Sequence, residues 1–179
     1  MKSFIANITL IILLPFVLIC QNQKETPMTI KLKSKDFKDG GMMPKQLTCD
    51  GKNISPQLSW NDVPEGTQSF ALICDDPDAP VGTWVHWVIF NIPANIRELQ
   101  EAFPTQKDFP NGIKQGINDF RKIGYGGPCP PSGTHRYFFK IYALDIVLEL
   151  SAGATKQELL HAMENHILAK GELIGRYKR

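Results

Sequence analysis

Two segments of the sequence each place a histidine beside an aromatic residue on one face of an expected β-strand. Side chains on a strand alternate between its two faces, so every second residue points the same way. The two faces predicted in this way consist of Trp84, His86 and Val88, and of His135, Tyr137 and Phe139. If both faces meet at one end of a sheet, two imidazoles and a phenol converge on one pocket.

A rigid acidic turn and a glycine-rich loop supply further groups to this pocket. The run Asp76-Pro-Asp78-Ala-Pro follows the end of an expected strand, and its prolines stiffen the backbone. Carboxylates beside histidines hold the imidazoles in a donor tautomer or keep them charged. The glycines of residues 124–131, including Gly127, allow backbone N–H groups to approach a ligand closely. This loop is therefore predicted to bind an oxyanion or phosphate.

The elements expected to position these groups are mostly β-strands. Runs of apolar, β-branched and aromatic residues predict strands at 29–33, 69–75, 84–91 and 135–144. Residues 93–131 are rich in polar residues and glycine, which predicts surface loops. One helix is expected over about 156–170, with Thr155 and Glu158 at capping-box spacing and Gly171 at its end. This order predicts a β-sandwich or barrel with a helix packed against it.

The composition is that of one ordinary globular domain. The chain has 179 residues, of which 42% are hydrophobic and 21% charged, and its net charge is +2. It contains 14 glycines and 13 prolines, which favours turns and loops over a helical bundle. No basic stripe with interleaved aromatic residues is present, and the basic end at 176–179 is short. We therefore expect no nucleic-acid partner.

The start of the chain predicts export. Lys2 precedes an apolar run at 8–19 that is short for a membrane span but suits the core of a signal peptide. The sequence ending at Cys20 resembles the lipobox of bacterial lipoproteins, although Ile19 is larger than the residue this motif prefers. Lipidation at Cys20 is the first interpretation, and an uncleaved membrane anchor is the alternative.

The expected organisation is a signal peptide or lipoprotein signal, a short linker and one domain. Their predicted boundaries are 1–20, 21–27 and 28–179. The expected location is the bacterial cell envelope, either in the periplasm or attached to a membrane through the N-terminal lipid anchor.

Export changes the interpretation of the other cysteines. Cys74 lies in the apolar run of an expected strand, so we interpret it as a small core residue. Cys49 and Cys129 lie in loop sequence, and an oxidising compartment favours pairing them. Such a bridge closes a loop of about 80 residues and contributes about 4 kcal/mol in the chain-entropy model. A zinc pair is the competing interpretation, although Cys-x-x-Cys spacing is absent.

A set of short motifs surrounds the predicted pocket. They are Asp76-Pro-Asp-Ala-Pro80, Trp84-Val-His86, Gly127-Pro-Cys-Pro-Pro131, His135-Arg-Tyr137, Thr48-Cys-Asp-Gly-Lys-Asn-Ile-Ser-Pro56 and Asn118-Asp-Phe120. Together they resemble the phosphatidylethanolamine-binding protein family, in particular its bacterial Raf-kinase-inhibitor-like branch, over roughly residues 28–177. The resemblance implies a mostly β fold, an antiparallel β-sandwich of a large and a small sheet with a C-terminal α-helix.

The resemblance also implies a pocket for phosphate-like and carboxylate anions, including phospholipid headgroups. Carried over position by position, the ligand-binding residues are Asp76, Asp78, Trp84, His86, Gly127, His135 and Tyr137. A bridge between Cys49 and Cys129 is likewise similar to exported bacterial members. The C-terminal extension that lines the pocket in animal members is not evident in this sequence.

The leading prediction is a non-enzymatic binding protein for a small anion, with neither a cofactor nor a metal. The glycine-loop amides and His135 are expected to bind the oxyanion, and Asp76 to orient a histidine. His86 and Tyr137 are expected to donate further hydrogen bonds, and Trp84 is expected to form a wall of the site. Affinity is then expected to fall as pH rises through the histidine pKa, about 6.5 when unperturbed.

Other function classes stay open. The resemblance allows an inhibitor or regulator of a partner protein, of the protease or kinase type, although an exported chain does not meet a cytoplasmic kinase. A hydrolase is less favoured, because Ser132 has no evident activating base and Gly-x-Ser-x-Gly is absent. His86, His135 and Asp76 are types that form facial metal triads. The sequence does not decide whether the chain forms a homodimer.

Overall fold

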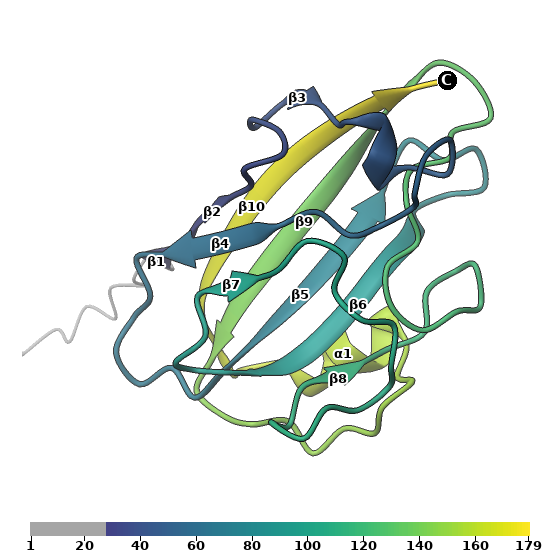
Figure 1. The fold of residues 1–179 in the computed structure, drawn as a ribbon. Coiled ribbons are helices and arrows are strands. Elements are labelled where there is room, and N and C mark those ends of the chain that lie inside the picture. Colours follow the sequence, from purple (N-terminus) through teal and green to yellow (C-terminus); the bar gives the residue numbers. More distant parts are fainter. Residues whose placement is uncertain (1–27) are drawn as a thin grey trace, which may run out of the picture.

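The computed structural model describes residues 28–179 (Figure 1). The predicted signal segment, the linker and the lipidation at Cys20 lie outside these residues. Within the described part of the chain, no helix has the length and apolarity that crossing a membrane requires.

Two sheets form the body of the molecule. The larger one contains β1 (Met28–Thr29), β3 (Gly41–Met42), β5 (Ser69–Asp76), β6 (Trp84–Pro93), β8 (Lys114–Gln115), β9 (Thr134–Leu144) and β10 (Ile167–Lys178). The smaller one contains β2 (Lys31–Lys33), β4 (Leu58–Asn61) and β7 (Glu98–Leu99). A short 3-10 helix η1 (Lys45–Leu47) and the helix α1 (Lys156–Ala162) complete the elements of the described chain. The expected mostly β architecture of a large and a small sheet with a helix is confirmed.

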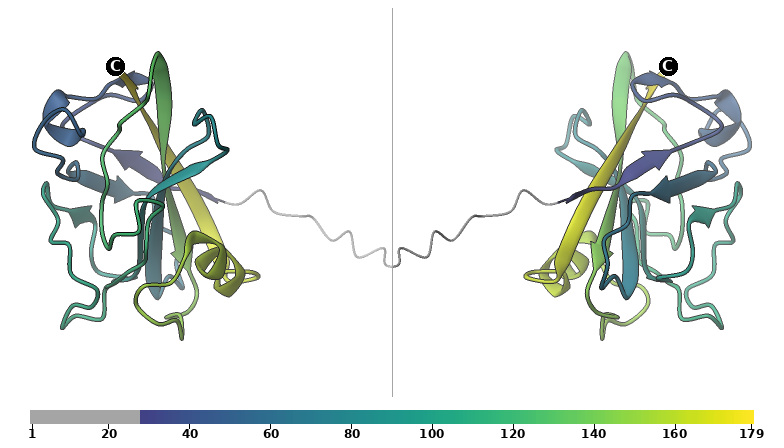
Figure 2. Two further views of the ribbon diagram at one scale, coloured as in Figure 1. Left: turned by 90° about the vertical axis from the view of Figure 1, so that its right-hand side faces the viewer. Right: turned by 90° about the vertical axis from the view of Figure 1, so that its left-hand side faces the viewer.

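The large sheet lies between the small sheet and α1 (Figure 2). Its long strands pair antiparallel in the order β10-β9-β5-β6, whereas β1 and β3 add to β10 in parallel. Both faces of β5 are buried, which is why its sequence is continuously apolar rather than alternating. The expected strand positions at 69–75, 84–91 and 135–144 are confirmed with small changes at their ends.

Alternation along β5 divides the hydrophobic residues into two cores. Phe70, Leu72 and Cys74 face the small sheet in the first core, and Ala71 and Ile73 face α1 in the second core. Cys74 is buried and unpaired, which confirms its interpretation as a small core residue.

The predicted helix is half as long as expected. Its start is confirmed, because Thr155 and Glu158 form a capping box, but α1 ends at Ala162 and the chain continues into β10. Gly171 is therefore inside a strand rather than at a helix end. A Cβ on Gly171 would lie 2.2 Å from the Ile30 carbonyl oxygen, so the glycine permits β1 and β2 to lie close to β10. On the buried face of β10, glycines stand where a strand usually has apolar side chains. The sequence of β10 therefore lacks the alternation of apolar and polar residues that indicates a strand.

A buried carboxylate ties α1 to the sheet. Asp75 on β5 is 1% exposed and points to the helix side. Its oxygens accept hydrogen bonds from Lys140 Nζ of β9 at 2.9 Å and from Lys156 Nζ at the start of α1 at 2.5 Å. Two cations from different elements therefore share one buried negative charge.

A disulfide connects two loops near the start of β9. Cys49 and Cys129 are bonded with their Cα atoms 5.4 Å apart, which confirms the predicted pairing over the zinc alternative. Over residues 28–179, no group of three or more histidine, cysteine or acidic side chains is arranged to hold a metal ion.

Candidate functional site

A pocket of about 190 Å³ lies where the end of β5, the start of β6 and the start of β9 meet. Its lining residues come from these strands and from three loops. They are Asp76, Ala79, Pro80, Val81, Trp84, His86, Phe120, Cys129, Pro130, Pro131 and His135. The structure thus brings together four of the predicted ligand-binding residues, namely Asp76, Trp84, His86 and His135.

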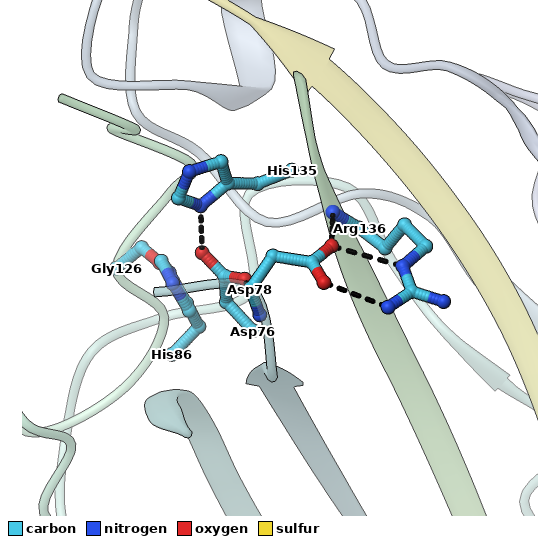
Figure 3. A network of polar contacts seen from close by, with 6 residues as sticks. All are labelled: Asp76, Asp78, His86, Gly126, His135 and Arg136. Atoms are coloured by element: carbon cyan, nitrogen blue, oxygen red, sulfur yellow. Dashed lines mark hydrogen bonds and ion pairs between the residues drawn. The ribbon is translucent and has the colours of Figure 1, made fainter. Parts of the chain in front are cut away.

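An Asp–His pair forms one side of the pocket (Figure 3). His135 Nδ1 lies 2.7 Å from Asp76 Oδ2, and Asp76 is only 3% exposed. The other oxygen of Asp76 accepts the backbone N–H of Asp78 at 2.8 Å, so the acidic turn fixes the carboxylate. The expected contact between Asp76 and a histidine is present. It orients His135, because the carboxylate holds the ring through Nδ1.

His86 lies at a β-bulge in β6. Cys74 pairs with Trp87 and Asp75 pairs with Val85, so His86 is an extra residue without a partner on β5. Bulges redirect side chains and recur beside binding sites. The bulge explains how His86 reaches a pocket at the end of the sheet.

The bulge also changes which residues share a face. Trp84 and His86 both line the pocket, as the alternation predicted. Val88 instead packs in the second core, so its predicted place on the same face as His86 is wrong. On β9, the predicted face is confirmed, since Tyr137 and Phe139 lie in the first core and His135 lines the pocket above them.

The ring of His86 is fixed from one side by a backbone carbonyl. Its Nδ1 lies 2.6 Å from the Gly126 carbonyl oxygen, while the Gly126 N–H donates to the His86 carbonyl oxygen at 2.8 Å. Burial lowers the pKa of His86 below its ordinary value, and this effect exceeds the opposite effects of the Gly126 carbonyl and of Asp76 and Asp119. His86 is therefore uncharged at neutral pH.

Two aromatic rings enclose His86. Phe120 packs edge-on against it at 5.3 Å between ring centroids and Tyr137 does so at 5.1 Å. Phe120 also packs against Trp84, at 5.5 Å, and completes the wall of the pocket. Tyr137 is fully buried beneath His86, and its hydroxyl has no hydrogen-bond partner within residues 28–179. The residue therefore lies below the lining rather than in it.

Gly127 does not bind as the glycine-loop prediction supposed. Its N–H donates to Asn53 Oδ1 at 2.7 Å and is not available to a ligand. A Cβ on Gly127 would lie 2.4 Å from the Leu47 carbonyl oxygen, so the glycine permits the two loops to pack closely. The expectation of an oxyanion nest at Gly127 is wrong because the loop directs this N–H into the protein.

Asp78 likewise lies outside the pocket lining. Its carboxylate accepts hydrogen bonds from the Arg136 backbone N–H and from two nitrogens of the Arg136 guanidinium, at 2.7–2.9 Å (Figure 3). This pair ties the acidic turn to β9, and the contact of Asp78 with a ligand stays a prediction.

The Asp78–Arg136 pair predicts a pH-dependent contribution to stability. The hydrogen bonds and charge of Arg136 lower the pKa of Asp78 from 3.8 to about 2. A depressed carboxyl pKa stabilises the fold above the unfolded-state value, and the contribution is lost as pH falls toward the folded-state value. Because the pair is partly exposed, we expect Asp78→Asn to lower the free energy of unfolding by about 1 kcal/mol at pH 7.

Urea denaturation at several pH values measures this effect. The difference between the native protein and Asp78→Asn is expected to shrink between pH 4 and pH 2, where the native carboxyl also becomes protonated. A constant difference over this range would contradict the role given to the carboxylate.

The sequence and the fold are similar to those of known proteins. Residues 33–178 match the model of a family described as phosphatidylethanolamine-binding protein. The chain belongs to the phosphatidylethanolamine-binding protein family. A UPF0098 protein of Methanothermobacter thermautotrophicus is 55% identical over 150 residues, which cover 84% of this chain and 99% of that protein. A UPF0098 protein of Aquifex aeolicus is 56% identical over 149 residues, covering 82% of this chain and 86% of the relative.

Solved structures of family members have the same fold. A phosphatidylethanolamine-binding protein homologue from Chlamydia trachomatis is 42% identical with a TM-score of 0.77, and Escherichia coli YbcL is 34% identical with a TM-score of 0.78. Each alignment covers 84% of this chain and 98% of the solved chain. The resemblance of the motifs to the phosphatidylethanolamine-binding protein family is therefore confirmed.

Phe120 and Gly126, which both contact His86 in this family member, were absent from the predicted set of ligand-binding residues. Phe120 belongs to a motif that carried the resemblance, but an aromatic residue in a loop does not by itself indicate where it packs. Gly126 contributes its carbonyl oxygen to His86, and sequence offers no signal for a backbone acceptor. Both contacts depend on how the long loop folds back over β6.

Proposed function

We propose that this family member binds a small anion in the pocket through His135 and does not catalyse a reaction on it. The observation that carries the proposal is the buried Asp76–His135 pair at the pocket wall. A carboxylate that accepts from Nδ1 leaves the opposite ring nitrogen, Nε2, for a ligand. In the proposed complex, the anion accepts a hydrogen bond from this nitrogen.

The size and walls of the pocket support a small ligand with an apolar part. Its volume of about 190 Å³ suits a headgroup-sized molecule and lies below the range of about 300–1,000 Å³ that is usual for drug-sized ligands. Phe120, Trp84 and the two adjacent prolines form apolar walls, and Val81 at the rim is 80% exposed. A phosphate ester with an aryl or alkyl group matches this combination.

The lining also favours binding over catalysis. Among the lining residues, the carboxylate of Asp76 is engaged by His135 and by a backbone N–H, and Cys129 is in a disulfide. No lysine amine, serine or threonine hydroxyl belongs to the lining. The lining residues therefore offer no free hydroxyl, thiol or lysine amine as the nucleophile of covalent catalysis.

The proposed location is an oxidising compartment of the cell envelope. The disulfide between Cys49 and Cys129 supports it, because such bonds persist in oxidising environments. The proposal also includes attachment of the protein to a membrane through a lipid on Cys20 and binding of a protein partner. Its main element is the anion pocket.

Calorimetric titration with phenyl phosphate tests the anion site. The native protein is expected to bind it, and His135→Ala is expected to weaken binding at least about tenfold, because a charge-assisted hydrogen bond is lost. His161→Ala is the matched control, since the His161 side chain is 83% exposed on α1, and it is expected to leave binding unchanged. Equal affinity in the native protein and His135→Ala would refute the proposed site.

A further inference from the structure

We propose that His86 is a hydrogen-bond acceptor in this pocket, so that the site selects oxyanions that carry a proton. A phosphate monoester in its hydrogen phosphate form has such a proton, whereas a sulfate ester does not. This inference rests on the proposed anion site and names which class of anion the site prefers. It reverses the expectation from sequence, in which His86 was a donor.

The first step is the assignment of the proton on the ring. His86 Nδ1 lies 2.6 Å from the Gly126 carbonyl oxygen. A carbonyl oxygen only accepts, so Nδ1 must carry the hydrogen. The return hydrogen bond from the Gly126 N–H to the His86 carbonyl oxygen holds the two residues together and keeps the ring in this orientation.

The second step concerns the other ring nitrogen. Nε2 of His86 makes no hydrogen bond with any of residues 28–179, and it is not one of the enclosed polar atoms without a partner, which in this part of the chain are Trp60 Nε1 and the Tyr137 hydroxyl. Since His86 lines the pocket, Nε2 is reached from the pocket. The neutral ring presents a lone pair there and can only accept.

The third step is the neutrality of the ring. His86 is 2% exposed and lies between the rings of Phe120 and Tyr137. Three carboxylates act on it: Asp76 and Asp75 from β5, and Asp119 from the loop that carries Phe120. Each raises the pKa of His86, but burial lowers it by more, and the net shift is downward.

The two histidines therefore offer different chemistry to one ligand. In the proposed anion site, His135 is the side that donates to the anion, and His86, whose Nδ1 donates to a carbonyl, is the side that accepts. A ligand that satisfies both has one unprotonated oxygen and one hydroxyl on the same centre. A fully ionised oxyanion places a lone pair against the lone pair of Nε2, which leaves a buried acceptor unsatisfied.

Phenyl phosphate and phenyl sulfate form a matched pair of probes. At pH 6.0, phenyl phosphate is about half monoanion, because the second pKa of a phosphate monoester is about 6. This monoanion has the same charge and nearly the same shape as phenyl sulfate, and the proton is the difference between them. We expect the native protein to bind phenyl phosphate at least about tenfold more tightly than phenyl sulfate.

The variant His86→Asn removes Nε2 and so tests the role of this nitrogen. The amide of asparagine places an N–H where Nδ1 lies and keeps the hydrogen bond to the Gly126 carbonyl, while nothing replaces Nε2. We expect the preference for phenyl phosphate to fall to about twofold or less in this variant. Thermal unfolding of the variant checks that it is folded, and ¹⁵N NMR of the native protein is expected to show an unprotonated Nε2 on His86.

The outcomes separate this inference from the proposed function. If both esters bind with equal affinity, the anion site stands and the acceptor role of His86 is refuted. If the preference persists in His86→Asn, or if NMR shows a protonated Nε2 on His86, the acceptor role is refuted as well. If neither ester binds, the proposed anion site itself fails.

Discussion

Replacing both Lys140 and Lys156 by methionine is expected to lower the free energy of unfolding by about 4 kcal/mol, whereas each single replacement lowers it by about 1 kcal/mol. The reason is the shared carboxylate of Asp75, which is 1% exposed. With one lysine removed, the other still pairs with it at hydrogen-bond distance. With both removed, a buried charge has no partner, and either unfolding or protonation must follow.

Urea denaturation of the two single variants and the double variant measures the non-additivity. The triple variant that also carries Asp75→Asn is the control, because a neutral amide removes the unpaired charge. We expect it to recover most of the stability that the double variant loses. Strictly additive effects of the two lysines would show that Asp75 does not depend on them jointly.

Removal of the disulfide is expected to lower the free energy of unfolding by about 4 kcal/mol, since Cys49→Ala with Cys129→Ala frees a long loop in the unfolded chain. The bonded residues are 80 positions apart. Because Cys129 and the two prolines after it line the pocket, the same variant is expected to bind phenyl phosphate more weakly than the native protein.

Cys74→Ala is the control for this experiment. It removes one buried sulfur atom from the first core and is expected to lower the free energy of unfolding by about 1 kcal/mol, with binding unchanged. Denaturation and titration of both variants give the comparison. A disulfide variant as stable as the Cys74→Ala control would contradict the contribution assigned to the bridge.

Sequence predicted the central strands and a contact between Asp76 and a histidine because their signals are local. A run of apolar residues such as 69–75 must be buried, and alternation along β9 places His135 on the pocket side whatever its neighbours are. The turn after Asp76 is rigid because of the prolines within the five residues 76–80. Contacts with distant segments do not change these local features, so the predictions based on them agree with the structure.

The errors arose where contacts between distant segments decide the structure. The bulge at His86 depends on its pairing with β5, and alternation alone assigned Val88 to the wrong face. The direction of the Gly127 N–H depends on Asn53, which lies 74 residues earlier. Strand β10 was not predicted from the sequence, because its glycines make room for other strands instead of contributing apolar side chains.

The parallel pairing of β1 with β10 has a practical consequence for attaching this protein to a surface or a label. Met28 pairs with Ala169, and His135 pairs with Tyr177, eight residues further along β10, which is about 27 Å at the usual rise of a strand. The C-terminal Arg179, by contrast, donates to Cys129 at the pocket wall. A biosensor chip should therefore hold the protein by its N-terminal side, since a tag after Arg179 would sit beside the mouth of the pocket.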